Sequence, residues 1–172
     1  RTPWHQDAGV MNKKGQKGTE LVTCWIPFTK TRIENGCMLA VKESHKYGLV
    51  NHVTGSKGQV EIKGKEIIDK LPTVALEADV GDIILLNKYL LHCSLPNKSK
   101  NFRISMDLRF NKAGQPSGRD PLPNFIIRSK NKDKIKIQNY KQWIALWEEA
   151  KVKCIPRKWS YKYPLPTFKG SK

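Results

Sequence analysis

Two histidines and one aspartate constrain the fold of this chain more than any other feature of its sequence. His5 and Asp7 flank Gln6 near the first residue, whereas His92 lies far downstream. Side chains two positions apart on an extended segment point the same way, so His5 and Asp7 would face one cavity. Two imidazoles and one carboxylate on one face of a metal suit non-haem Fe(II) and leave the opposite face open. For His92 to join them, strands distant in the chain must line that cavity.

A fourth residue, Arg103, follows His92 on a predicted strand in which its neighbours Phe102 and Ile104 are apolar. An arginine in the interior pattern of a strand is costly unless it is paired. A guanidinium grips a carboxylate through two parallel hydrogen bonds, so a keto-acid cosubstrate would pair it. The alternatives are that the candidate metal ligands are ordinary surface or core residues, and that Arg103 faces outward or pairs with Asp107.

Strand-like segments and tight turns dominate the first two thirds of the chain. Residues 20–28 and 37–41 are expected to form a hairpin across the Asn35-Gly36 turn. Residues 73–78 precede a turn at 79–82, after which a hydrophobic run leads to His92 at its end. Residues 101–110 alternate as a further strand. Short strands without βαβ alternation predict an antiparallel jelly roll.

Three other segments complete the expected organisation. Residues 47–70 are polar and glycine-rich and predict a long loop. Residues 139–151 predict one helix. Its apolar stripe is expected to pack on the sheet and comprises Tyr140, Trp143, Ile144 and Trp147. From Ile155 onward, prolines predict an irregular tail whose aromatic side chains lie along the domain surface.

The length of 172 residues suits a single domain, expected to consist of a jelly-roll core over 1–129 and a helix and tail over 130–172. The chain begins at Arg1 rather than at methionine, and candidate ligands lie almost at that residue. We therefore expect a C-terminal portion of a longer protein whose N-terminal part is missing.

The formal charge of +17 would ordinarily suggest nucleic acid or an anionic membrane. The excess is mostly lysine, spread along the chain without interleaved aromatic residues, which favours a generally basic, solvated surface. No apolar run approaches the roughly 20 residues that span a bilayer. The four cysteines lack metal-site spacing and are expected to be small buried residues in a reducing cytoplasm.

Several motifs together resemble the phytanoyl-CoA dioxygenase family over residues 3–129. These motifs are Trp4-His5-Gln6-Asp7, Glu34-Asn35-Gly36-Cys37, Ser44-His45-Lys46, Gly81-Asp82 before His92, and Asn97 with Arg103. Proteins of that family are double-stranded β-helix (jelly-roll, cupin-like) oxygenases that use Fe(II) and 2-oxoglutarate.

The resemblance implies that His5, Asp7 and His92 are the iron ligands and that Arg103 binds the distal carboxylate of 2-oxoglutarate. It also implies that Ser94 and Trp25 lie near the cosubstrate, where Ser105 could add a hydroxyl. One departure is Lys42-Glu43-Ser44-His45, which stands where the family often has Pro-Gly-Ser-His. This leaves the turn and the role of His45 open.

The expected function is hydroxylation of a small organic substrate with O₂. The substrate would be anionic if Arg109, Arg119 and Arg128 face the pocket. Halogenating relatives replace the carboxylate ligand with a small residue, so the presence of Asp7 favours hydroxylation. The alternatives are a non-redox, cupin-like metal-binding module, which gives Arg103 no use, and an oxidative demethylase of nucleic acid.

Overall fold

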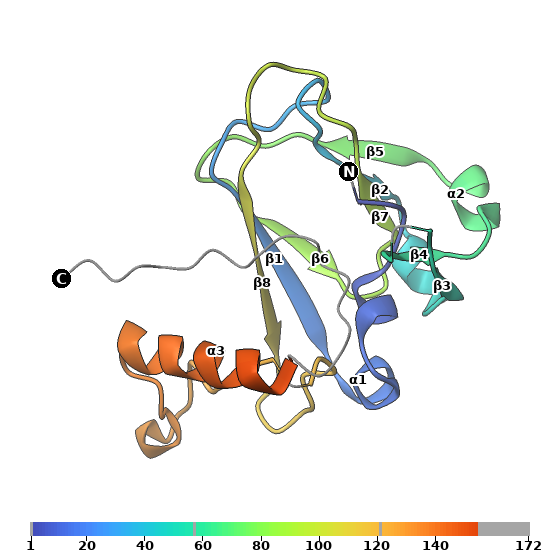
Figure 1. Ribbon diagram of the computed structural model, residues 1–172. Helices are drawn as coiled ribbons and strands as arrows, with labels where there is room; N and C mark the ends of the chain where they lie inside the picture. The colour runs from blue at the N-terminus through green and yellow to red at the C-terminus, as the bar shows by residue number, and fades with distance from the viewer. Residues whose placement is uncertain (1, 57, 121, 155–172) are drawn as a thin grey trace. The chain divides into compact units, whose positions relative to one another are not determined.

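The computed structural model describes residues 2–56, 58–120 and 122–154 and contains two compact units, Arg1–Asp120 and Pro121–Lys172 (Figure 1). Each unit is treated by itself. The expectation of one oxygenase domain over the whole chain stays a prediction, and the expected irregular tail from Ile155 lies outside the described residues.

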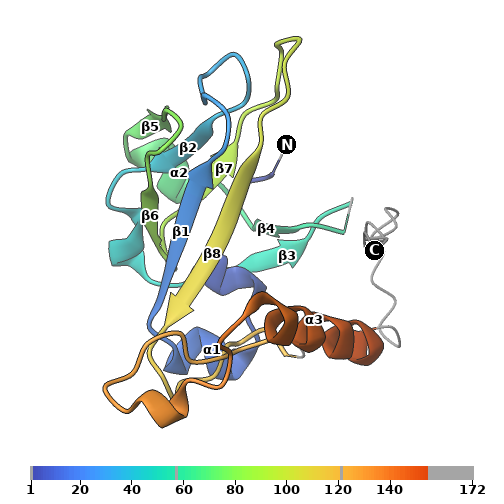
Figure 2. The same ribbon diagram turned by 90° about the vertical axis from the view of Figure 1, so that its left-hand side faces the viewer.

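The first unit contains two antiparallel sheets of three strands each. One has the order β6–β1–β8, from Ile84–Asn87, Leu21–Pro27 and Ser105–Asn111. The other has the order β5–β2–β7, from Thr73–Leu76, Met38–Val41 and His92–Ser94. In the first sheet, β1 and β8 run side by side over their whole length (Figure 2). These sheets confirm the predicted mainly β class.

A shared core joins the two sheets. Trp25 of β1 and Leu86 of β6 pack with Met38 of β2 from the other sheet, together with Ala78. Each of these side chains is at most 5% exposed. Alternation along the strands directs one face of each sheet into this core, because successive side chains on a strand point to opposite faces. The sheets therefore lie face to face as two layers.

The predicted hairpin between residues 20–28 and 37–41 is wrong. Instead of pairing with β2, β1 pairs with β6 and β8, while β2 pairs with β5 and β7. The Asn35-Gly36 turn does reverse the chain, with Gly36 at φ +88°. A turn signal fixes a local reversal but not the partner of the strand that follows. Here the turn carries the chain from one sheet to the other.

The hydrophobic run that leads to His92 is likewise divided between the sheets. Strand β6 ends at Asn87, and a turn follows in which the Leu90 N–H donates to the Asn87 carbonyl at 2.9 Å. Strand β7 then begins at His92 in the second sheet. Arg103 also differs from expectation, since it precedes β8 rather than lying within it.

Residues 47–70 are not the predicted long loop. They contain the two-stranded sheet of β3 (His52–Thr54) and β4 (Val60–Ile62), followed by α2 (Glu66–Lys70). The strands are too short to show the alternation of apolar and polar residues that predicts a strand from sequence. Short helical segments complete the unit, namely η1 (Asp7–Val10), α1 (Lys13–Gly18) and η2 (Ser44–Tyr47).

The Lys42–His45 segment keeps a tight turn without the family's Pro-Gly pair. Glu43 adopts a left-handed conformation at φ 58°, a region usually left to glycine. Ser44 is buried; its hydroxyl donates to the Val41 carbonyl and accepts the Leu91 N–H at 2.9 Å. Ser44 therefore ties the end of β2 to the residue before His92. The side chain of His45 is exposed, outside the candidate site.

The second unit contains the predicted helix, α3 (Tyr140–Cys154), preceded by the short η3 (Lys132–Lys134). Trp143 and Trp147 meet edge to face with ring centroids 6.0 Å apart, as expected for side chains one turn apart. Packing of this helix on the sheet stays a prediction. None of the described helices is both long enough and apolar enough to cross a membrane.

Replacing Gly36 with alanine should destabilise the fold by about 2 kcal/mol. The added Cβ would make the left-handed backbone conformation unfavourable and would come too close to neighbouring backbone atoms. At Gly36 a Cβ would lie 2.8 Å from the Leu95 carbonyl oxygen. Gly18→Ala is the control, since a Cβ there meets nothing within 4 Å. Urea unfolding should show a lower free energy of unfolding for Gly36→Ala alone, and equal losses in both variants would contradict this account.

Candidate metal centre

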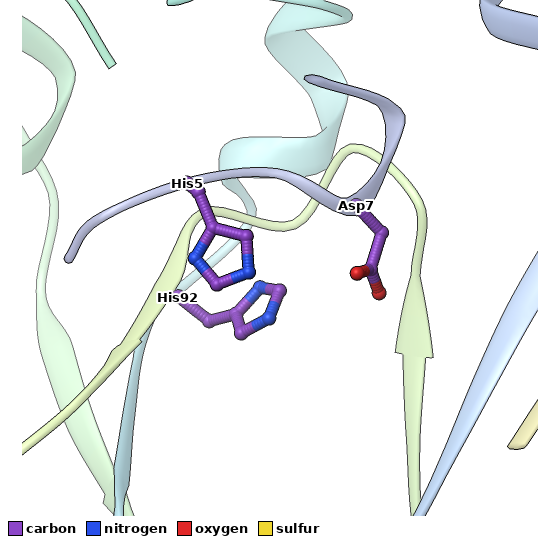
Figure 3. Close-up of side chains that lie close together, drawn as sticks. All are labelled: His5, Asp7 and His92. Carbon is purple, nitrogen blue, oxygen red and sulfur yellow. The ribbon is translucent and has the colours of Figure 1, made fainter. Parts of the chain in front are cut away.

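His5, Asp7 and His92 come together in the first unit. One potential ligand atom from each lies within 4.8 Å of the others (Figure 3). Two of the side chains come from the segment before α1 and the third from the start of β7. The close-up shows the two imidazoles facing each other, with the Asp7 carboxylate directed toward the same space.

Backbone pairing brings the two histidines into register. The His5 N–H donates to the His92 carbonyl and the His92 N–H donates to the His5 carbonyl, both at 3.0 Å. Residues paired in this way on antiparallel segments project their side chains to the same face. The ring centroids are accordingly 4.3 Å apart. The backbone pairing of His5 with His92 therefore sets the relative position of both candidate ligands.

Each imidazole has its Nδ1 occupied by a backbone carbonyl. The distance is 2.9 Å from His5 Nδ1 to the Pro3 oxygen and 3.0 Å from His92 Nδ1 to the Leu90 oxygen. Because a carbonyl can only accept, Nδ1 must carry the hydrogen in both rings. The Nε2 lone pairs are left for a metal, which is how outer hydrogen bonds usually orient ligating histidines.

The carboxylate of Asp7 is 1% exposed and has a partner on each oxygen. Thr23 donates its hydroxyl hydrogen to Oδ2 at 2.5 Å, and Arg109 Nη2 donates to Oδ1 at 2.8 Å. Burial alone would raise the pKa of Asp7, but the Arg109 charge and the Thr23 hydrogen bond hold it below the ordinary value. The carboxylate is therefore ionised and ready to bind a cation at neutral pH.

Gln6 fixes the backbone between the two ligands. Its extended conformation puts its side chain on the side opposite His5 and Asp7, as predicted. The side chain is fully buried, and its amide donates to the carbonyls of Gly48 and Tyr89. Its oxygen accepts the Val50 N–H at 2.9 Å. Three backbone partners therefore anchor a segment that has little regular structure of its own.

His52 supports the same segment and was not singled out from the sequence. Its Nε2 accepts the Gln6 N–H at 3.1 Å, while its Nδ1 lies 2.8 Å from the Val50 carbonyl oxygen. Its ring occupies the space that a side chain at Gly9 would need, since a Cβ there would lie 2.4 Å from the ring. No local motif marks this histidine, because Gln6, whose N–H it accepts, is remote in the chain.

Both sheets line the cavity in front of the candidate ligands. Thr23 and Trp25 come from β1, while Met38 and Ser94 come from the opposite sheet. Strand β8 contributes every second residue along one face, and Arg103 lies just before that strand. The β8 residues are Ser105, Asp107 and Arg109. The predicted cosubstrate residues thus share one cavity with His5, Asp7 and His92.

Arg103 is held at the wall of this cavity. Its Nη1 donates to the Ser105 hydroxyl at 3.0 Å, and its guanidinium lies 5.7 Å from the centroid of the Trp25 ring. In the described part of the chain it forms no ion pair with Asp107. The hydroxyl of Ser94 accepts the Thr2 N–H at 2.6 Å. The cosubstrate roles of these residues stay predictions.

The donors suit Fe(II). Two imidazoles and one carboxylate form a mixed nitrogen and oxygen set of the kind that binds non-haem iron. Each ligand has an outer partner that fixes its orientation, and all three line the same cavity. Cys93 also lines the cavity, but no sulfur belongs to the cluster.

The sequence of this chain is similar to known proteins. The family model described as phytanoyl-CoA dioxygenase matches residues 1–105. The phytanoyl-CoA dioxygenase domain-containing protein 1 homolog of Dictyostelium discoideum is 32% identical over 114 residues, which cover 62% of this chain and 39% of that protein. The 2-aminoethylphosphonate dioxygenase of an uncultured bacterium is 28% identical over 112 residues, covering 65% of this chain and 40% of that protein.

A solved structure of similar fold extends the comparison beyond the matched sequence. The apo form of the non-heme monooxygenase ThoJ has a TM-score of 0.64 at 19% identity, covering 88% of this chain and 57% of that one. This likeness confirms the predicted double-stranded β-helix. The chain spans only about two fifths of the length of the two curated relatives described above.

Acid should destabilise the metal-free chain. Burial, reinforced by His92, holds the pKa of His5 below 6.5, and burial also lowers that of His52. Below pH 6.5 the unfolded chain therefore binds protons that the folded chain does not, so the free energy of unfolding falls as pH drops. The slope is at most about 1.4 kcal/mol per pH unit for each group. The lowered pKa of Asp7 adds a loss only near and below pH 3.8.

Urea unfolding at about pH 7.5 and about pH 5.5, with a chelator present, measures this effect. His5→Gln should reduce the difference between the free energies of unfolding measured at the two pH values. His45→Gln, which alters an exposed histidine outside the site, should leave it unchanged. A free energy of unfolding that is independent of pH in the unaltered chain would contradict the expectation.

Proposed function

Because this chain belongs to the phytanoyl-CoA dioxygenase family, we propose that it is the metal-binding part of an Fe(II)- and 2-oxoglutarate-dependent dioxygenase that hydroxylates a small organic substrate. The observation that carries the proposal is the convergence of two imidazoles and one ionised carboxylate on a cavity that also contains Arg103. In this proposal His5, Asp7 and His92 hold the iron.

When bound, iron with 2-oxoglutarate and O₂ supplies the oxidation, which yields succinate, CO₂ and a hydroxyl group in place of a substrate hydrogen. The chain contributes orientation and charge. His5 and His92 present their Nε2 atoms because carbonyls occupy both Nδ1 atoms. Asp7 contributes a negative charge that burial and its two partners keep in place.

Arg103 would receive the distal carboxylate of 2-oxoglutarate. Its hydrogen bond to Ser105 and its position over Trp25 fix the guanidinium before any ligand arrives. A preorganised cation loses less conformational freedom on binding, which favours affinity. Ser94 lines the same cavity from the other sheet and offers a further hydroxyl.

The proposed substrate is small, polar and anionic. The bacterial relative is named for 2-aminoethylphosphonate, a small charged molecule, which supports this class. The expected support from arginine is weaker than the sequence indicated, because Arg109 is paired with Asp7. Arg128 belongs to the second unit, and Asp107 adds a negative group to the cavity wall.

Burial raises the pKa of Asp107 above its ordinary value. A cytoplasmic location completes the proposal, supported by Cys24 and Cys37, which are buried and form no disulfide in the described part of the chain. The non-redox metal-binding module remains the second candidate, because the three ligands alone would serve it. A nucleic-acid demethylase has less support, because the lysines and arginines are spread along the sequence without interleaved aromatic residues.

Binding of 2-oxoglutarate should depend on both the metal and Arg103. With Mn(II) present, 2-oxoglutarate should raise the thermal midpoint of the unaltered chain, since a ligand that binds only the folded state stabilises it. Arg103→Ala should remove this shift. Arg32→Ala should retain it, because Arg32 pairs with Asp79 outside the cavity. An equal shift in Arg103→Ala would contradict the role of Arg103.

Turnover should require Asp7. With Fe(II), 2-oxoglutarate and O₂, the unaltered protein should form succinate, and Asp7→Ala should lower the rate at least about 100-fold through loss of a metal ligand. A panel of small metabolites should identify the substrate as the compound that stimulates succinate release. Full activity in Asp7→Ala would overturn the assignment of the iron ligands, and metal binding without succinate formation would favour the non-redox module.

A further inference from the structure

We propose that Arg109 and Thr23 form a carboxylate cradle that positions Asp7, so that Asp7 offers the metal a single oxygen in a fixed direction. The inference rests on the proposed function, because it assigns a role to these residues only if Asp7 binds the metal. Arg109 and Thr23 are positioning residues, and neither is a ligand in this account.

The cradle is built by strand register. Thr23 of β1 and Arg109 of β8 are direct partners across the first sheet. Residues opposite each other on antiparallel strands project to the same face, so both reach the same buried group. Each takes a different oxygen of Asp7, Thr23 binding Oδ2 and Arg109 binding Oδ1. The carboxylate is therefore gripped from two adjacent strands.

The fold does not need Arg109 to hold the ligand segment. The backbone around Asp7 is already fixed by the buried side chain of Gln6 and by the bond from Gln6 to His52. The Ala8 N–H also donates to the Lys88 carbonyl at 3.0 Å. With the backbone held in this way, the main freedom left to Asp7 is rotation of its carboxylate. The cradle removes that freedom.

Rotation of the carboxylate would affect the metal directly. A carboxylate can bind a metal through one oxygen or through both. Binding through both would occupy a position on the open face, which a bidentate cosubstrate needs. Each oxygen of Asp7 accepts one hydrogen bond and keeps a further lone pair. The two bonds fix the plane of the carboxylate, so the cradle opposes the rotation that would turn both oxygens toward the metal. Its contribution is to keep the open face available.

The charge of Arg109 by itself would act on the metal in the opposite direction. A cation beside a divalent metal repels it, so if Arg109 acts only through its charge, its removal should tighten metal binding. If Arg109 acts by positioning Asp7, its removal should weaken metal binding. Loss of an outer partner of a metal ligand typically lowers metal affinity by about 10- to 100-fold. The two accounts therefore predict opposite signs.

Co(II) is a suitable probe, since it prefers similar ligands to Fe(II) and its visible absorption reports the coordination around it. Titration of the full chain should give about 10- to 100-fold weaker binding for Arg109→Gln and for Thr23→Val. Arg109→Lys keeps a cationic donor and should recover part of the lost affinity. Arg32→Gln, which breaks an Arg–Asp pair remote from the cavity, should bind Co(II) like the unaltered chain.

The visible spectrum separates positioning from a general loss of stability. In Arg109→Gln and Thr23→Val the bound Co(II) should absorb more weakly, because binding through both oxygens raises the coordination number. Unchanged or tighter binding, with an unchanged spectrum, in both variants would overturn the inference. If Arg109→Gln does not fold, Thr23→Val decides by the same criteria, since it removes one hydroxyl with little change of shape. Failure of the unaltered chain to bind Co(II) would instead overturn the proposed function.

Discussion

The reciprocal backbone hydrogen bonds between His5 and His92 are the contact on which the candidate site depends. They join an N-terminal segment with little regular structure to a strand in the second sheet. This pairing places both imidazoles on one face, and Asp7 follows because Gln6 is extended. Carbonyls on both Nδ1 atoms then direct the Nε2 atoms toward the cavity. The geometry of the metal site is therefore mainly a consequence of backbone pairing.

Electrostatics explains why a buried carboxylate is tolerated at this position. An ionised group that is 1% exposed would be strongly unfavourable without partners. The Arg109 charge and the Thr23 hydroxyl compensate the lost hydration of Asp7. Arg103 and Arg109, which lie six positions apart near the same face of β8, thus have distinct partners within the protein. Arg109 is paired with a candidate ligand, while Arg103 donates to the Ser105 hydroxyl and lies over the Trp25 ring.

Supporting residues outside the cavity fix the segments next to the candidate ligands. Glu43 adopts the left-handed backbone for which glycine is the usual choice, and Ser44 still bonds to Val41 and Leu91. The turn therefore keeps its connection to the residue before His92. His52 and Gly9 perform a comparable task on the other side of the ligand segment, where the ring of His52 fills the space beside Gly9.

The sequence by itself determined the mainly β class, the α3 helix, the Asn35-Gly36 reversal and the residues that form the candidate site. These features depend on local patterns, such as strand alternation, turn chemistry, and the side-chain types that suit iron and carboxylates. Only the tertiary structure decided which strands pair, that β1 and β2 belong to different sheets, and that Arg109 binds Asp7. It also showed that His52 bonds to the ligand segment and that the buried side chain of Gln6 anchors that segment. Such contacts join residues remote in the chain, so their geometry depends on sheet register and burial, which no local pattern specifies.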